Sequence, residues 1–194
     1  MAKDRVAAHK KGALRARRSI VFIDESGFML QPLVRATWAP KGRTPVIKSW
    51  DRRDRLTALS ALTLSARRRR LGLYFTVQRT NAKTDDVVAF LLSVRRQLRR
   101  RLVVVLDRLA AHRAAARRLR QTHGDAFRFE WLPAYAPELN PVECVWSQSK
   151  YGHLSNLVPR DIEDLEEHAC DSLDTIRREQ PRLRGCFAHA GLPL

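Results

Sequence analysis

The sequence lacks several features that define whole classes of protein. No apolar run approaches the roughly 20 residues that span a bilayer, and the basic N-terminus is not followed by a signal-type apolar segment. Cysteine is scarce, because Cys144, Cys170 and Cys186 are the only three and no two of them have CxxC spacing. Neither a disulfide framework nor a zinc ribbon is therefore supported. We expect a soluble, intracellular protein with reduced thiols and no membrane partner.

Positive charge, in contrast, is abundant. The 194 residues include 37 Lys and Arg against 20 Asp and Glu, which gives a formal net charge of +17. A field of this sign concentrates phosphates at the protein surface, so a nucleic acid is the leading candidate partner. Ribosomal and membrane-surface proteins share this signature, and charge alone does not separate these classes. A cytoplasmic, nucleoid-associated protein would fit it.

The pattern of apolar residues predicts one domain. Residues 1–18 are basic with little apolar periodicity, which indicates a basic arm or linker. A globular domain is predicted over residues 19–180, and a C-terminal tail over residues 181–194. Strands are predicted at residues 20–23, 56–64, 71–77, 102–106 and 127–132, and helices near residues 84–100, 110–121, from 141 onward and 161–179.

The order of these elements predicts an α/β fold. The first three strands are close enough in sequence for antiparallel hairpins, whereas strands and helices alternate in the second half, which favours parallel pairing. A mixed five-stranded sheet with helices on both faces follows. Residues 28–54 contain three prolines and a glycine between short apolar pieces, and we interpret them as a hairpin-like excursion.

Two predicted strands end in an aspartate, Asp24 and Asp107. Functional groups in α/β sheets gather at the carboxyl ends of central strands, although an aspartate alone at such a position more often caps a turn or helix. A third carboxylate, Glu143, follows Asn140 and Pro141, which suit the cap and first position of a helix. Glu143 either closes this cap or is delivered by the helix beside the two strand ends.

Three carboxylates without an obvious basic partner would repel one another unless a cation lay between them. Hard oxygen ligands suit Mg²⁺ or Mn²⁺, and two such ions can stabilise both the attacking and the leaving oxygen of a phosphodiester displacement. Together with the net positive charge, this predicts phosphoryl transfer on a nucleic acid.

Three segments of the chain carry a family resemblance. They are residues 22–28 (FIDESGF), residues 105–107 (VLD) followed by His112 and Arg113, and residues 132–143 (LPAYAPELNPVE) with Trp146. These segments resemble bacterial insertion-sequence transposases of the mariner-related superfamily, which carry a DDE superfamily endonuclease domain. The third segment is the longest and most specific, and the short spacing between Asp107 and Glu143 is also similar to that of the group.

The resemblance covers nearly everything from residue 19 to about residue 155. It implies an RNase H-like fold and a metal-binding catalytic triad of Asp24, Asp107 and Glu143, holding two Mg²⁺ or Mn²⁺ ions. It also implies that DNA is cut at element ends and that a 3′-hydroxyl then attacks target DNA. Because two element ends are handled together, a homodimer is one assembly that would meet this requirement.

The chain departs from the family pattern in two ways. Arg108 stands where family members commonly have Asn after the second aspartate. Upstream helix-turn-helix modules are also usual in the family, yet Asp24 comes only 23 residues after the start. A separately encoded upstream half or a truncated copy would account for this. Two alternatives therefore stay open: an inactive remnant that binds DNA nonspecifically, and an RNase H-like nuclease without strand transfer.

Several basic residues are candidate DNA contacts. They are Arg67, Arg68, Arg69 and Arg70 in the turn between the second and third strands, together with Arg108 and His112 beside Asp107. Solvated loops explain the arginine run nearly as well, and His112 could equally cap its helix or face solvent. Cys144, next to Glu143, is interpreted as a packed thiol instead of a metal ligand.

Overall fold

The computed structural model describes residues 18–49, 54–66, 70–192 and 194. A five-stranded sheet with the strand order β3-β2-β1-β4-β5 forms its centre. The strands are β1 (Ser19–Met29), β2 (Arg55–Leu64), β3 (Leu71–Gln78), β4 (Leu102–Leu106) and β5 (Phe127–Trp131). The first three pair antiparallel, and β1, β4 and β5 pair parallel. This confirms the predicted mixed sheet.

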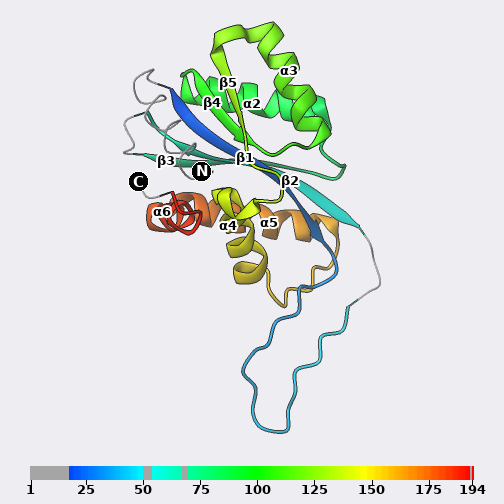
Figure 1. Cartoon of the computed structure of the whole chain (residues 1–194). Coiled ribbons are helices and arrows are strands. Elements are labelled where there is room, and N and C mark those ends of the chain that lie inside the picture. The colour runs from blue at the N-terminus through cyan, green and yellow to red at the C-terminus, as the bar shows by residue number, and fades with distance from the viewer. Residues whose placement is uncertain (1–17, 50–53, 67–69, 193) are drawn as a thin grey trace.

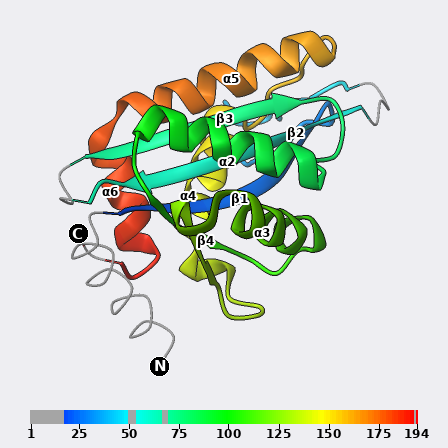
Figure 2. The same ribbon diagram turned by 90° about the horizontal axis from the view of Figure 1, so that it is seen from above.

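Helices cover both faces of this sheet (Figures 1 and 2). On one face lie α2 (Thr84–Leu98) and α3 (Ala110–His123), and on the other lie α4 (Pro141–Ser147), α5 (Ile162–Arg178) and α6 (Gln180–His189). Alternate residues of β1 supply the two cores: Val21 and Ile23 pack with α2 and α3, whereas Ile20 and Phe22 pack with α4 to α6. Within the described residues, no helix combines the length and apolarity that a membrane crossing requires.

The first strand is longer than its sequence pattern indicates. We predicted that the polar residues from Asp24 onward would end the strand, but β1 continues to Met29 and pairs with β2 along this whole stretch. The reason is that β2 supplies backbone partners, so polar side chains are tolerated where the strand reaches the edge of the core. The parallel pairing with β4 does stop early, at Phe22 and Val105. Asp24 therefore lies where the sheet opens on its β4 side.

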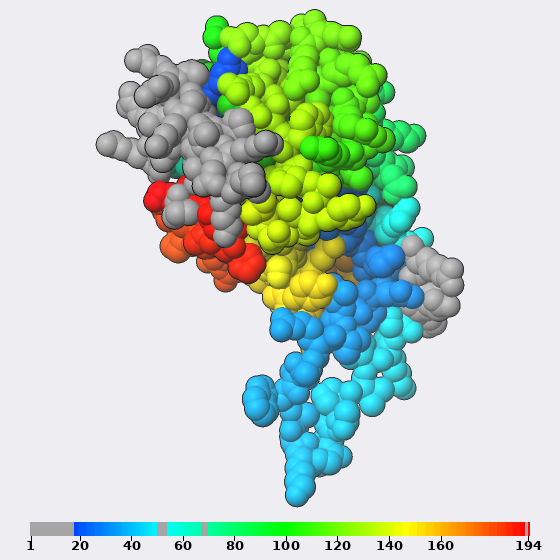
Figure 3. All heavy atoms as spheres, in the orientation of Figure 1, coloured from blue at the N-terminus to red at the C-terminus, as the bar shows by residue number. Residues whose placement is uncertain are grey.

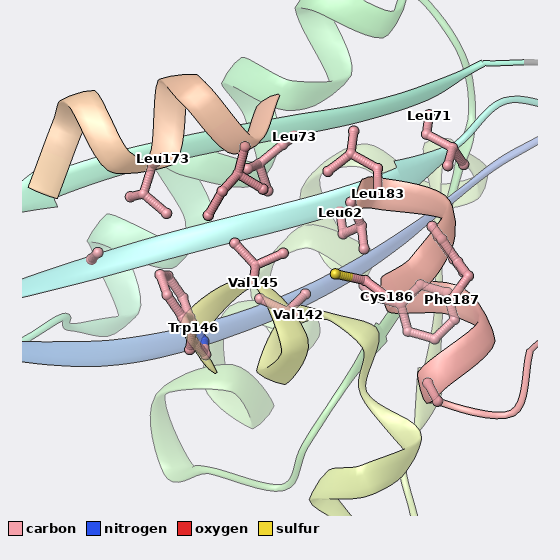
Figure 4. Packing of buried hydrophobic residues seen from close by; sticks show 14 of the residues in the cluster. Leu62, Leu71, Leu73, Val142, Val145, Trp146, Leu173, Leu183, Cys186 and Phe187 are labelled. Atoms are coloured by element: carbon pink, nitrogen blue, oxygen red, sulfur yellow. The ribbon is translucent and has the colours of Figure 1, made fainter. Parts of the chain in front are cut away.

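The C-terminal segment belongs to the same domain. Residues 181–194 were predicted to be a tail beyond it, yet α6 begins at Gln180 and its Leu183, Cys186 and Phe187 are completely buried. Figure 4 shows these side chains packed against Leu62 of β2 and Val142 of α4. The apolar residues of α6 are few and widely spaced, which is why their periodicity was not evident. Residues 1–17 of the predicted basic arm lie outside the described residues.

A long excursion joins β1 to β2 and projects from the body of the molecule (Figures 1 and 3). Its described part, residues 30–49, forms no strand ladder of its own, so the hairpin-like prediction is wrong in this respect. A turn links Pro40 and Arg43, and Leu33 makes an isolated bridge with Ser155. Trp38 is fully exposed at 101%.

Candidate active site

Asp24 projects from β1 toward α4. It lies on the same face of the strand as Phe22, which packs in the core beneath α4 to α6. The α4 helix is held against this part of β1 by Asn140, whose Nδ2 donates a hydrogen bond of 3.2 Å to the carbonyl oxygen of Ile23. Asn140 also caps α4, since its Oδ1 accepts from the Val142 backbone N–H at 3.2 Å. One buried amide thus fixes the start of α4 beside Asp24.

The carboxylate of Asp24 is buried, with only 9% of the residue exposed. Trp146 Nε1 donates a hydrogen bond of 3.1 Å to its Oδ2, and the Trp146 ring packs edge-on against Phe28. Burial and the nearby negative charge of Glu143 raise the pKa of Asp24 to about 7, although the Trp146 bond opposes this. A buried carboxylate beside other carboxylates is the electrostatic setting in which a cation would be stabilised.

Asp107 is the first residue after β4, the strand that pairs with β1. Phe22 pairs with Val105, so extending the parallel register by two residues brings Asp107 level with Asp24. Partial burial would raise the pKa of Asp107, but hydrogen bonds from His112 and from the Leu109 backbone N–H outweigh it and lower that pKa. The two aspartates therefore differ in their electrostatic environments.

The His112 side chain is hydrogen-bonded to Asp107 and is not exposed to solvent. It is completely buried, and its Nδ1 lies 2.5 Å from Asp107 Oδ1. Its Nε2 is buried without a hydrogen-bond partner among the described residues, so the ring proton belongs on Nδ1, where the carboxylate accepts it. The first turn of α3 directs the His112 ring inward, so His112 is not at the surface and cannot make the predicted DNA contact.

Glu143 is exposed in the first turn of α4. The sequence left open whether it closes the helix cap. In the structure the Asn140 backbone N–H donates to the Pro137 carbonyl at 2.8 Å, so the cap does not use the Glu143 carboxylate. Its charge instead acts on Asp24. The arrangement favours the second interpretation, in which α4 delivers a carboxylate beside the two strands.

Lys150 is a site residue that the sequence analysis missed. It lies in the π-helical segment η3 (Gln148–His153), which follows α4 directly. Its Nζ donates to Ser26 Oγ at 2.7 Å and lies 5.5 Å from the centre of the Phe28 ring. Burial lowers the pKa of Lys150, while the charges of Glu143 and Asp24 oppose that shift. Its position seven residues after Glu143, two helical turns, was the signal that could have identified it.

The chemistry of the three carboxylates fits a divalent cation. They supply hard oxygen ligands from two adjacent strands and one helix start. Burial and the charge of Glu143 both raise the pKa of Asp24, and a bound cation would oppose both effects. In the part of the chain that the structure describes, however, no three acidic, His or Cys side chains are gathered closely enough to hold an ion as they stand. Binding an ion would require the carboxylates to move closer together.

Cys144 faces away from this site. Cys186 donates to its Sγ at 2.6 Å, and Gln148 Nε2 also lies near both sulfurs. Both cysteines are free thiols, and the contact joins α4 to α6. This agrees with the interpretation of Cys144 as a packed thiol.

The predicted basic contacts lie in different places. Arg67, Arg68 and Arg69 are outside the described residues. Arg70 is exposed at the turn between β2 and β3. Because Leu64 pairs with Ile20, this turn lies at the N-terminal end of β1, whereas Asp24 lies in the middle of that strand. Arg108 is exposed beside Asp107, where it lines an open groove along α3.

Comparison with known proteins identifies the family. Residues 19–166 match the DDE superfamily endonuclease family, and this range includes all three carboxylates. The chain belongs to this family. The match confirms the resemblance carried by the three motifs around Asp24, Asp107 and Glu143. Among curated proteins, an uncharacterized protein of Sinorhizobium fredii (strain NBRC 101917 / NGR234), y4pE/y4sA, is 41% identical over 46 residues, which are 24% of this chain and 34% of that protein.

Solved structures of the Mos1 mariner transposase share the fold of this DDE endonuclease domain. Its paired-end complex with Mg has a TM-score of 0.61 at 17% identity, covering all of this chain and 61% of that chain. Its strand transfer complex has a TM-score of 0.57 at 17% identity, covering 98% of this chain and 59% of that chain. The fold is accordingly RNase H-like, as expected. This chain spans less than two thirds of the length of these relatives.

Proposed function

We propose that this chain is the catalytic domain of a transposase, which cuts DNA and transfers the cut strand to a target in a divalent-metal-dependent reaction. The observation that carries the proposal is the buried carboxylate of Asp24, whose pKa is raised to about 7 by burial and by the neighbouring charge of Glu143, with a smaller contribution from Asp107. Membership of the endonuclease family supports it, as does the fold shared with Mos1, whose solved structures include a strand transfer complex and paired-end complexes with Mg and with Mn.

In this proposal Asp24, Asp107 and Glu143 hold two Mg²⁺ or Mn²⁺ ions. When bound, the ions would activate the attacking oxygen and stabilise the leaving oxygen of the phosphodiester. The chain's own residues set the geometry: Trp146 orients the Asp24 carboxylate, and His112 orients that of Asp107. The oxygen atoms that these bonds leave free are then available to a cation.

Lys150 has a separate role in this proposal. Its ammonium group is partly buried beside Ser26 and near the acidic site. A lysine in this position would contact a phosphate oxygen next to the one that reacts and would place the DNA strand over the carboxylates. DNA is therefore the proposed partner. For the complete transposase, the proposal also includes a homodimer and a separately encoded helix-turn-helix DNA-binding half.

The decisive experiment is nicking of supercoiled plasmid in Mg²⁺ or Mn²⁺. Wild type is compared with Asp107→Asn and Glu143→Gln. Glu138→Gln is the matched control, because Glu138 is an exposed acid in the turn that precedes α4. We expect nicking by wild type and the control, and a loss of at least a hundredfold in the two site variants. A wild type that binds plasmid without ever cutting it would overturn the proposal in favour of an inactive remnant.

The products separate a transposase from a nuclease. A short duplex that ends in a free 3′-hydroxyl is added to the plasmid reaction. Strand transfer joins this oligonucleotide to the plasmid covalently, whereas simple hydrolysis leaves only free ends. Nicking without any joined product would retain the metal-dependent site but reject strand transfer.

A further inference from the structure

An open groove beside the carboxylates is lined by arginines and one tryptophan. Its charged and aromatic lining consists of Arg108, Arg113, Arg117, Arg120 and Trp131. Arg108 directly follows Asp107, and Trp131 pairs with Leu106 in the last row of β4 and β5. The groove therefore begins at the edge of the sheet where Asp107 lies and continues along α3, on the face of the sheet opposite to α4.

The helix presents these arginines as a single stripe. Positions 113, 117 and 120 are separated by four and three residues, which places them on one side of an α-helix. An adjoining side of the helix, with His112, Ala115, Ala116 and Leu119, is buried against the sheet. From the first residue of α3, the three arginines lie about 5, 10 and 15 Å along the helix axis. The positive charge is thus spread in a line that leads away from the active site.

The groove arginines form no ion pair with any acidic residue that the structure describes. Across the described residues, no carboxylate forms an ion pair with Arg108, Arg113 or Arg117. In contrast, Arg118, on another side of the same helix, pairs with Asp85 of α2, and Arg128 of β5 pairs with Glu130. Charges that fold stability does not use, aligned beside an active site, indicate an anionic ligand.

Arg120 and Trp131 form the side wall of the groove. The Arg120 guanidinium lies 5.4 Å from the centre of the Phe129 ring and donates to the Phe129 carbonyl at 3.4 Å. This stacking limits the freedom of the side chain, so less entropy is lost when it binds a ligand. Trp131 is only partly buried.

We propose that this groove binds the sugar–phosphate backbone of duplex DNA on one side of the phosphate that reacts. The inference rests on the proposed function, because it takes the strand in the groove to be continuous with the strand at the carboxylates. One strand of a duplex carries a phosphate about every 3.4 Å of its axis, so the stripe from Arg113 to Arg120, about 10 Å long, matches about three phosphates. The contacts are to the backbone and carry no sequence preference.

The test compares two charge-matched double variants. Arg113→Gln with Arg117→Gln removes two groove charges, and Arg118→Gln with Arg128→Gln removes two charges that are already paired. Binding of a fluorescent duplex is measured without divalent ions over a range of salt concentrations. Each lost phosphate contact lowers the slope of log K against log salt by about 0.9. The groove variant should therefore lose about 2 units of slope and on the order of tenfold in affinity at 0.1 M salt.

The outcomes are distinct. Equal losses in both double variants would mean that only net charge matters and would overturn the groove, as would unchanged duplex binding by the groove variant. A loss confined to single-stranded DNA would also overturn it. Because binding is measured without metal, the result is independent of cutting. A wild type that never nicks, combined with the expected slope change, would reject the proposed function and retain the groove as a DNA site.

A strand-transfer assay then distinguishes the two possible sources of the duplex. If the groove holds target DNA, the groove variant needs more plasmid, but no more donor oligonucleotide, to reach half of its maximal rate. If it holds the donor end, the dependence is reversed. A variant with wild-type dependence on both DNAs would contradict the proposal.

Discussion

Replacing Asp24 with asparagine is expected to stabilise the metal-free protein at alkaline pH. The carboxylate is buried beside Glu143, and its pKa of about 7 lies above the value of 3.8 for an exposed aspartate. Asparagine has nearly the same shape, and its amide oxygen can still accept the hydrogen bond from Trp146. The substitution therefore removes the charge and leaves the packing in place.

The sign and size of the effect follow from the linkage of proton binding to folding. Between pH 3.8 and 7, the folded chain keeps a proton on Asp24 that the unfolded chain has lost, so the folded state loses stability as the pH rises through this range. The difference of 7 − 3.8 = 3.2 pH units corresponds to at most about 4.5 kcal/mol at about 1.4 kcal/mol per unit. Asp24→Asn should exceed wild type by up to this amount at pH 8, and by much less near pH 4.

Urea denaturation in EDTA, repeated from pH 4 to pH 8, measures the free energy of unfolding of both proteins. Asp107→Asn is the control with the opposite sign. Hydrogen bonds from His112 and Leu109 outweigh partial burial and lower the pKa of Asp107, so its ionised form stabilises the fold. That variant should be less stable than wild type at neutral pH. Addition of Mg²⁺ or Mn²⁺ should then stabilise wild type and affect both variants much less.

Two results would refute this reasoning. The first is a difference between Asp24→Asn and wild type that stays constant from pH 4 to pH 8, because it would mean that Asp24 titrates normally in the folded chain. The second is equal stabilisation of wild type and Asp24→Asn by the metal ion, which would remove Asp24 from the proposed ligands.

Three further predictions concern the residues that position the carboxylates. Trp146→Phe removes the N–H that lowers the pKa of Asp24, so the loss of metal-free stability should extend to higher pH in the same urea series; an unchanged range would contradict the role of this bond. Asn140→Ala removes a helix cap and a buried hydrogen bond to β1, so it should lower the free energy of unfolding by about 2 kcal/mol in urea denaturation. Asn140→Asp keeps the cap and should have an intermediate free energy of unfolding. His112→Phe fills the same space without a donor, so the pKa of Asp107 should rise and the pH profile of nicking should shift upward; a lower rate with an unshifted profile would indicate a structural role alone.

Local patterns in the sequence were sufficient for most of the fold. The continuous apolar run of β4 and the helical spacing of apolar residues in α2 and α5 depend on contacts that repeat every few residues, and these elements were predicted nearly to their ends. The three carboxylates were also predicted from the sequence, because Asp24 and Asp107 follow apolar runs and Glu143 follows a helix cap, each inside a recognisable motif. Such features are encoded locally and can be read without knowing what packs against them.

The tertiary structure alone decided what surrounds those carboxylates. The pairing of β2 with β1 extends the strand past Asp24, and the packing of α4 brings Lys150 to Ser26, 124 residues away in the chain. The inward turn of α3 buries His112 against Asp107, and α6 completes the core. These are contacts between distant segments, and burial and charge coupling depend on them. The sequence by itself therefore determined which residues carry the charge, and only the folded chain decided that Asp24 is protonated far more readily than Asp107, because desolvation and hydrogen bonding arise from neighbours that no local pattern records.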